Sequence, residues 1–144
     1  MNDQDVDILI IEDNVNDAEL TMRVLGKQKL ASNIIHLADG VEALDFLYGK
    51  GKFSGRNTDI KPRVIFLDLK MPRLNGLQVL DKIKNDPAYK SIPVVILTSS
   101  AEDPDIKKSF ELGANSYIVK PVEFENFAKT VSDLGLYWMV TNKI

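Results

Sequence analysis

The chain has 144 residues, 44% of them hydrophobic, a formal net charge of −3 and no cysteine. This length suits one domain, residues 1–144, and the missing cysteine excludes disulfides, thiolate nucleophiles and cysteine-based zinc sites. A mildly acidic chain is also not typical of a general binder of nucleic acid or membrane surfaces. Residues 1–6 form a polar tail unlike a signal peptide, and no apolar stretch approaches the roughly 20 residues of a membrane span. We therefore expect a cytoplasmic protein with neither nucleic acid nor membrane as a direct partner.

Short apolar runs alternate along the chain with segments of helical periodicity. The runs are mostly continuous rather than alternating, which predicts strands buried on both faces. They are Ile8–Ile11, Ile34–Leu37, Val64–Leu67, Val94–Leu97 and Tyr117–Val119. Apolar stripes at helical spacing predict helices over 18–25, 41–48, 77–83 and 106–112, and a long last helix over 123–140. Five strand–helix repeats with right-handed crossovers predict an α/β protein, a parallel sheet with helices on both faces.

The segment 49–62, which precedes the third predicted strand, differs from the other connections. It carries three glycines, a proline and many charges. Such a composition predicts an extended loop, which we expect to be mobile.

Polar residues follow four of the predicted strands. Glu12 and Asp13 come after the first, Asp68 after the third, Thr98 after the fourth and Lys120 after the fifth. Ligands of such sheets bind outside the carboxyl ends of the strands, so these residues should share one site. Carboxylates that lie close together repel one another unless a cation compensates, and Mg²⁺ suits oxygen ligands. The Lys120 ammonium and the Thr98 hydroxyl would then bind phosphate oxygens beside the metal.

These residues and their surroundings resemble the receiver domain of bacterial response regulators over nearly the whole chain. The acidic pair, the segment Asp68–Gly76, the strand end Leu97–Ser99 and the segment Gly113–Pro121 match that family in order. The resemblance implies a flavodoxin-like doubly wound (βα)5 fold with strand order 2-1-3-4-5. It also implies a two-component protein that accepts a phosphoryl group from the phosphohistidine of a sensor histidine kinase.

The resemblance assigns chemical roles to matching positions. Asp68 would be the phosphoacceptor, attacking phosphorus by in-line displacement. Asp13 and Asp68 would bind Mg²⁺ directly, Glu12 directly or through water, and Lys70 through its backbone carbonyl; Mn²⁺ could substitute.

Further roles concern the bound phosphoryl group and the shape of the site. Lys120 would bridge carboxylate and phosphoryl oxygens, and Thr98 would donate a hydrogen bond to phosphate. Tyr117 resembles the aromatic residue that turns inward as the threonine moves; a plain half-buried aromatic is the alternative. The residues expected to shape the site are Pro72, Gly76 and Pro121, the last in a cis peptide bond.

Two segments depart from the commonest receiver pattern. The segment 46–56, before the third predicted strand, is longer than in the common receiver. The chain ends in the segment 134–142, which contains Tyr137 and Trp138. Both resemble small regulators found beside bacterial phytochromes, which implies a phytochrome-like kinase as partner.

The last predicted helix carries apolar residues on more than one stripe, whereas packing on a sheet needs only one. Apolar patches mark interfaces, so we expect a homodimer; a monomer with residues 136–140 folded back is the alternative. The expected interface residues are Phe124, Phe127, Val131, Leu134, Tyr137 and Trp138.

The last helix runs almost to the chain end, so we expect no output domain and output through protein contacts. A relay to a histidine phosphotransfer protein would use the same site. An aspartyl-phosphate phosphatase is disfavoured because Lys70 stands where that enzyme class places its second acid. A pseudo-receiver that only binds is disfavoured by the complete residue set. We therefore expect no enzyme beyond self-catalysed phosphorylation and dephosphorylation, and His36 is interpreted as a packed or edge residue rather than a phosphohistidine.

Overall fold

The protein is a parallel five-stranded sheet covered by helices, seen in a computed structural model that describes residues 8–27, 34–71, 73–99, 101–121 and 123–134. The sheet order is β2-β1-β3-β4-β5, and every neighbouring pair is parallel. The strands are β1 (Ile8–Ile11), β2 (Ile34–Leu37), β3 (Val64–Leu67), β4 (Val94–Thr98) and β5 (Ser116–Val119). The predicted fold class and strand order are confirmed, with β4 reaching one residue further, to Thr98.

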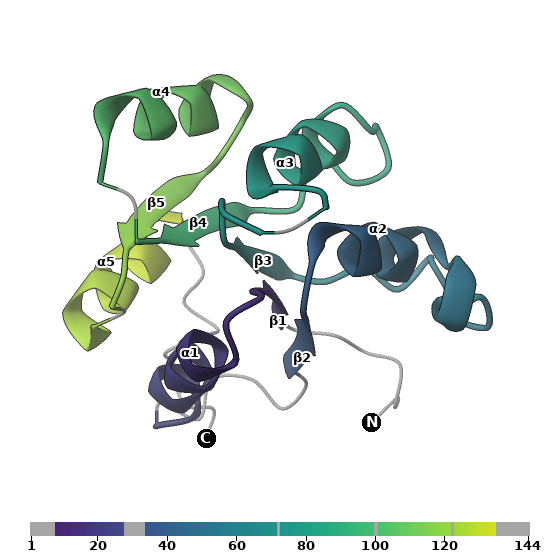
Figure 1. Cartoon of the computed structure of the whole chain (residues 1–144), viewed down its shortest axis with the longest axis horizontal. Helices are drawn as coiled ribbons and strands as arrows, with labels where there is room; N and C mark the ends of the chain where they lie inside the picture. The colour runs from purple at the N-terminus through teal and green to yellow at the C-terminus, as the bar shows by residue number, and fades with distance from the viewer. Residues whose placement is uncertain (1–7, 28–33, 72, 100, 122, 135–144) are drawn as a thin grey trace.

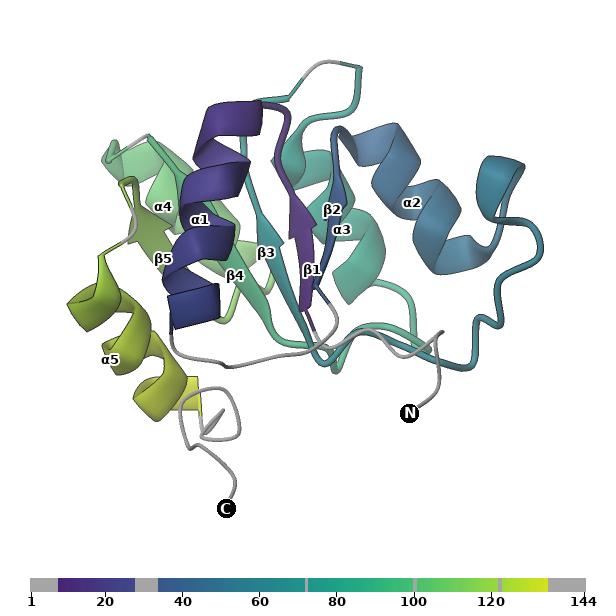
Figure 2. The ribbon, with the colours of Figure 1, turned by 90° about the horizontal axis from the view of Figure 1, so that it is seen from below.

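The helices divide between the two faces of the sheet. They are α1 (Val15–Lys27), α2 (Gly40–Tyr48), α3 (Gly76–Lys84), α4 (Asp103–Glu111) and α5 (Phe124–Leu134). Figure 1 shows α2, α3 and α4 on one side of the sheet and α1 and α5 on the other, an arrangement that Figure 2 shows from below. The predicted last helix is described as far as Leu134, and its extension to residue 140 lies outside the described residues. Among the described helices, none has the length and apolar character to span a membrane.

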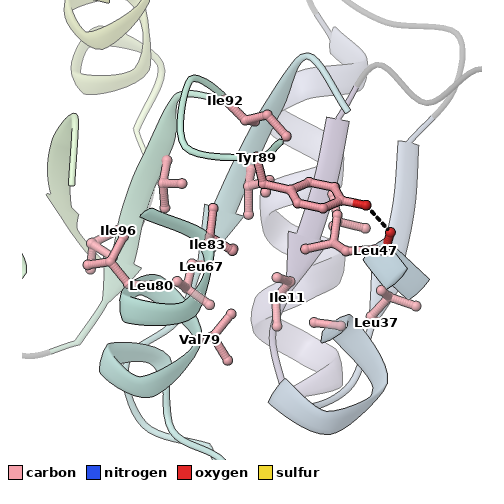
Figure 3. Packing of buried hydrophobic residues seen from close by; sticks show 14 of the residues in the cluster. Ile11, Leu37, Leu47, Leu67, Val79, Leu80, Ile83, Tyr89, Ile92 and Ile96 are labelled. Carbon is pink, nitrogen blue, oxygen red and sulfur yellow. Dashed lines mark hydrogen bonds between the residues drawn. The ribbon is translucent and has the colours of Figure 1, made fainter. Parts of the chain in front are cut away.

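The sheet is buried on both faces, which explains its continuous apolar runs. All residues of β1, β3 and β4 are buried. Alternate residues point to opposite faces, and Ile11, Leu67 and Ile96 belong to the cluster that packs under α2 and α3. Figure 3 shows this cluster, in which the Tyr89 hydroxyl donates to the Leu47 carbonyl at 2.5 Å. Burying each large aliphatic side chain stabilises the fold by about 1.5–3 kcal/mol.

The segment 49–62 contains a short 3-10 helix, η1 (Gly51–Phe53), and packs against α2. The Phe53 ring meets the edge of Phe46 with centroids 5.1 Å apart. The Arg56 guanidinium lies 3.9 Å from the Phe46 ring centre and donates to the carbonyls of Phe46 and Ile60. The long connection therefore has its own anchoring contacts.

Candidate functional site

The backbones of the site residues are fixed by hydrogen bonds that continue the sheet beyond its strands. The N–H of Glu12 donates to the carbonyl of Leu37, and the N–H of Asp68 donates to the carbonyl of Ile11, both at 3.0 Å. Since β1 lies between β2 and β3, these bonds hold the two acidic residues side by side at the carboxyl ends of the strands.

Three carboxylates meet at this edge of the sheet. Oxygen atoms of Glu12, Asp13 and Asp68 all lie within 4.8 Å of one another. Glu12 and Asp68 are 2% and 6% exposed, while Asp13 is exposed to solvent. Burial raises the pKa of Glu12 from 4.5 to about 7, and the Asp68 carboxylate adds to this rise while Lys120 opposes it. This set of hard oxygen donors suits a divalent cation such as Mg²⁺ or Mn²⁺.

The ammonium of Lys120 lies among carboxylates. Its Nζ is 2.5 Å from Glu12 Oε1, 2.9 Å from Asp17 Oδ2 and 3.5 Å from Asp68 Oδ2. Burial alone would lower the pKa of Lys120, but hydrogen bonds to Glu12 and Asp17 and the charge on Asp68 outweigh it, so the pKa is raised. A permanent cation therefore stands beside the nucleophile expected from the sequence.

Thr98 and Tyr117 lie on adjacent strands. Thr98 is fully buried as the last residue of β4, and its carbonyl accepts the N–H of Lys120 at 2.7 Å. Tyr117 on β5 is half-buried, lies opposite Ile96 in the register and packs against the main core cluster. Thr98 and Tyr117, the two residues expected to form a switch, thus lie on the neighbouring strands β4 and β5. Lys120 directly follows β5.

Gly76 fits a space that no side chain could share. A Cβ at this position would lie 2.1 Å from the Asp68 carbonyl oxygen and 2.6 Å from Leu69 Cα. The Gly76 N–H also donates to the Leu69 carbonyl at 2.8 Å. Gly76 therefore lets α3 begin directly against the backbone of Asp68.

The loop between β3 and α3 brings Lys70 close to the acidic cluster. The side chain of Lys70 is exposed, and with Asp13 it lines a hollow of about 450 Å³ beside the site. Pro72 lies outside the described residues. On the other side of the site, the Lys120–Pro121 peptide bond is cis, as expected.

The side chains of the expected dimer interface lie outside the part of the chain that the structure describes. The described part of α5 contains the backbone of some of these residues but not their side chains, and the rest lie beyond residue 134. The residues concerned are Phe124, Phe127, Val131, Leu134, Tyr137 and Trp138. The homodimer stays a prediction.

Two residues at the site carry contacts that the sequence did not reveal. Asp17 pairs with Lys120; its position four residues after Asp13 is the only signal that could have pointed to the site. His36 is half-buried on the edge strand β2, as interpreted, and its Nε2 lies 2.7 Å from the carbonyl oxygen of Glu12. Since a carbonyl oxygen only accepts, the imidazole N–H donates there.

A further contact ties the β3–α3 loop to α2. The Arg73 guanidinium lies 2.5 Å from the carboxylate of Asp39, which caps α2 by accepting the Glu42 N–H at 2.8 Å. Arg73 also has a positive φ of 65°, a conformation that few non-glycine residues adopt. The ion pair therefore helps to hold the loop that follows Asp68.

A buried aspartate between a lysine and two further carboxylates, at the carboxyl ends of a doubly wound sheet, defines a candidate phosphoacceptor and metal site. The family model of the response regulator receiver domain matches residues 8–132, and the chain belongs to this family.

Solved structures of phytochrome-associated regulators resemble the chain along nearly all of its length. The bacteriophytochrome response regulator RtBRR is 47% identical with a TM-score of 0.85, covering 96% of this chain and 83% of RtBRR. The bacteriophytochrome response regulator AtBRR is 45% identical with a TM-score of 0.84, covering 96% of this chain and 99% of AtBRR.

A third relative is the response regulator Rcp1 of Synechocystis sp. It is 35% identical over 134 residues, which cover 93% of this chain and 89% of Rcp1. A solved structure of Rcp1 in its Mn²⁺-bound form has a TM-score of 0.76 and covers 95% of this chain and 96% of that one. The chain is therefore a receiver-domain protein related to phytochrome response regulators.

Proposed function

We propose that the chain is the phosphoacceptor of a two-component system. A carboxylate oxygen of Asp68 attacks phosphorus, and the phosphorus–nitrogen bond of a kinase phosphohistidine breaks as the new bond forms. The observation that carries this proposal is the meeting of a buried Asp68 with the Lys120 ammonium at 3.5 Å and two more carboxylates within 4.8 Å. Nucleophile, fixed cation and metal ligands then surround one point.

We assign Mg²⁺ to the three carboxylates of Glu12, Asp13 and Asp68 and to the backbone carbonyl of Lys70, with Mn²⁺ able to substitute. The clustered oxygen donors and the Mn²⁺-bound form of Rcp1 support this assignment. When bound, the ion neutralises charge on the phosphoryl oxygens. Lys120, whose ammonium lies 3.5 Å from Asp68, would donate to the phosphoryl oxygens.

The signal leaves the site through β4 and β5 in this proposal. Thr98 donates its hydroxyl hydrogen to the phosphoryl group, and Tyr117 moves inward on the neighbouring strand. The surface of α4, β5 and α5 then changes and contacts a target protein. The description of RtBRR and AtBRR as bacteriophytochrome regulators supports a phytochrome-like histidine kinase as the phosphoryl donor.

A homodimer through α5 belongs to the same proposal. Its support is the apolar sequence of residues 124–138, which covers more than one helical stripe. Light scattering checks it, because a monomer at high micromolar concentration would contradict the dimer.

The central experiment is phosphorylation by acetyl phosphate with Mg²⁺, read by mass spectrometry. The wild type should form a labile acyl phosphate on Asp68, and Asp68→Asn should form none. Asp81→Asn, a matched change on an exposed residue of α3, should behave as the wild type. An equal adduct in Asp68→Asn would overturn the assignment, and no adduct in the wild type would favour a module that only binds.

A second measurement separates the metal ligands from the lysine. Asp13→Ala should weaken Mg²⁺ binding in calorimetry, whereas Lys120→Ala should leave it largely intact. Equal losses in both variants would contradict this division of roles.

A further inference from the structure

The ammonium of Lys120 is shared unequally among its partners. It lies 2.9 Å from the carboxylate of Asp17 but 3.5 Å from that of Asp68, the residue it is proposed to serve. Its shortest contact, 2.5 Å, is to Glu12. Glu12 and Asp17 therefore lie within ordinary hydrogen-bond distance of the ammonium, whereas the contact with Asp68 is longer than an ordinary hydrogen bond.

Asp17 and Glu12 differ in their surroundings. The Asp17 side chain is 38% exposed, whereas that of Glu12 is 3% exposed. Asp17 is also held in place, because its backbone N–H donates to Oδ1 of Asn14 at 3.0 Å in the first turn of α1. Asp17 is therefore a fixed partner on the solvent side, and Glu12 is the buried one.

We propose that Asp17 is a positioning residue that holds the Lys120 ammonium in the resting protein and releases it when a phosphoryl group reaches Asp68. This inference rests on the proposed phosphoacceptor function. In the proposed phosphorylated state Lys120 bridges the Asp68 carboxylate and a phosphoryl oxygen, which takes two of its three N–H groups. Only one N–H then remains for Glu12 and Asp17, so one of these two close partners must give up its hydrogen bond. If Glu12 lost its hydrogen bond to Lys120, a buried carboxylate would be left unpaired, which is costly. Water can instead solvate the partly exposed carboxylate of Asp17.

The surface beside this ion pair has room for the exchange. A hollow of about 230 Å³ opens there, between α1 and the start of the β5–α5 connection. It is lined by Asp17, Leu20, Thr21, Ser99, Lys120 and Pro121. Since the hollow reaches both charged groups, water can enter as they separate without unpacking the core.

The test is the affinity for fluoroberyllate, a phosphoryl mimic, at saturating Mg²⁺, measured by calorimetry on the full chain. Asp17→Asn should bind it about two- to fivefold more tightly, the effect of losing one partly exposed ion pair that competes for the lysine. Asp17→Glu, which keeps the charge, should bind as the wild type does. The matched control is Glu19→Gln, an equal charge change at an exposed residue of α1 that makes no ion pair with the described residues.

A merely structural role for Asp17 would give a different pattern. Loosening of the site would weaken both Mg²⁺ and fluoroberyllate binding in Asp17→Asn, whereas the proposal leaves Mg²⁺ affinity as in Glu19→Gln. Unchanged or weaker fluoroberyllate binding in Asp17→Asn, or an equal gain in Glu19→Gln, would overturn the inference. If the wild type itself bound no fluoroberyllate, the proposed phosphoacceptor function would fail instead.

Discussion

Two lysines stand at opposite ends of the same pair of strands, and their surroundings differ in kind. Lys120 at the carboxyl ends of β4 and β5 faces carboxylates. Lys84, at the end of α3 and near the amino ends of these strands, donates instead to neutral oxygens. These are the carbonyls of Lys90 at 3.0 Å and Ile92 at 2.8 Å and the Oδ1 of Asn115 at 3.0 Å.

The difference is visible in the direction of each pKa. Burial lowers the pKa of Lys84, because its acceptors carry no charge to offset the lost hydration. The pKa of Lys120 is raised despite burial, because hydrogen-bonded carboxylates stabilise its charge. One lysine satisfies backbone acceptors and joins elements, whereas the other stands where negative charge exceeds what one ammonium neutralises. Only the second arrangement has the negative charge that attracts a divalent cation.

The comparison predicts its largest effect on phosphorylation. Lys120→Ala should slow acyl phosphate formation from acetyl phosphate by about 100-fold, because a fixed donor to the developing phosphoryl charge is lost. Lys84→Met should leave the rate within about twofold of the wild type, since Lys84 lies near the amino ends of β4 and β5, away from the phosphorylation site. Equal slowing in both variants would abolish the distinction between the two lysines.

The burial of Glu12 beside Asp68 also predicts a dependence of stability on pH. The folded-state pKa of Glu12 is about 7, above its ordinary value of 4.5, so the folded protein holds an extra proton between these values. Its stabilising contribution is present below pH 4.5 and is lost as pH rises towards 7. Without metal, the wild type should lose about 2–3 kcal/mol of unfolding free energy across this range relative to Glu12→Gln.

Urea titrations in a chelator at pH 4.5 and 7 measure this difference. Saturating Mg²⁺ should reverse the trend, because the ion binds the ionised carboxylate and stabilises the folded state by linkage. Parallel pH profiles of wild type and Glu12→Gln would contradict the prediction.

Adding a methyl group at Gly76 or at Gly113 compares the two ends of the sheet. Gly76→Ala places a Cβ 2.1 Å from the Asp68 carbonyl oxygen, so the backbone must shift, at a cost of about 2 kcal/mol. Gly113→Ala places it 2.9 Å from Lys84 Cγ, a movable side chain, although φ is +108° there and also disfavours alanine. Both should lower stability in urea, but only Gly76→Ala should also slow phosphorylation of Asp68.

The smallest expected effect is the loss of stability when Lys84 is replaced. Lys84→Met keeps the apolar stem but removes the donor to the Lys90 and Ile92 carbonyls, which should cost about 1–1.5 kcal/mol. Asn115 Oδ1 also loses Lys84 but still accepts the Val94 N–H. Lys82→Met, an exposed neighbour on α3, is the control and should change stability by less than about 0.5 kcal/mol. Thermal or urea unfolding measures this difference. Equal losses of unfolding free energy in the two variants would contradict a stabilising role for the Lys84 hydrogen bonds.

The positions of the site residues were predictable because they depend on strand ends. Continuous apolar runs locate β1, β3, β4 and β5, and the polar residues Glu12, Asp68, Thr98 and Lys120 stand at or just beyond their ends. Parallel strands then bring these residues to one edge of the sheet whatever the helices do in detail. The receiver fold and the position of the acidic cluster follow from these facts.

The contacts between elements were not predictable in the same way. The pair of Asp17 and Lys120 joins residues 103 positions apart, and it depends on how α1 approaches the end of β5. Lys84 looks like an ordinary polar residue of an amphipathic helix, but the connection between α3 and β4 brings the carbonyls of Lys90 and Ile92 to it. The anchoring of the segment 49–62 likewise rests on Arg56 lying over Phe46, a pairing that no periodicity encodes.

The backbone bonds that extend the sheet past its strands limit which parts of the pocket can move. The N–H groups of Glu12, Asp68 and Lys120 are each bonded to a neighbouring strand at 3.0, 3.0 and 2.7 Å. With the main chain held at these three residues, a rearrangement there takes place in the side chains and not by a hinge movement of the backbone. The sheet therefore sets the positions of these three residues before any ligand binds.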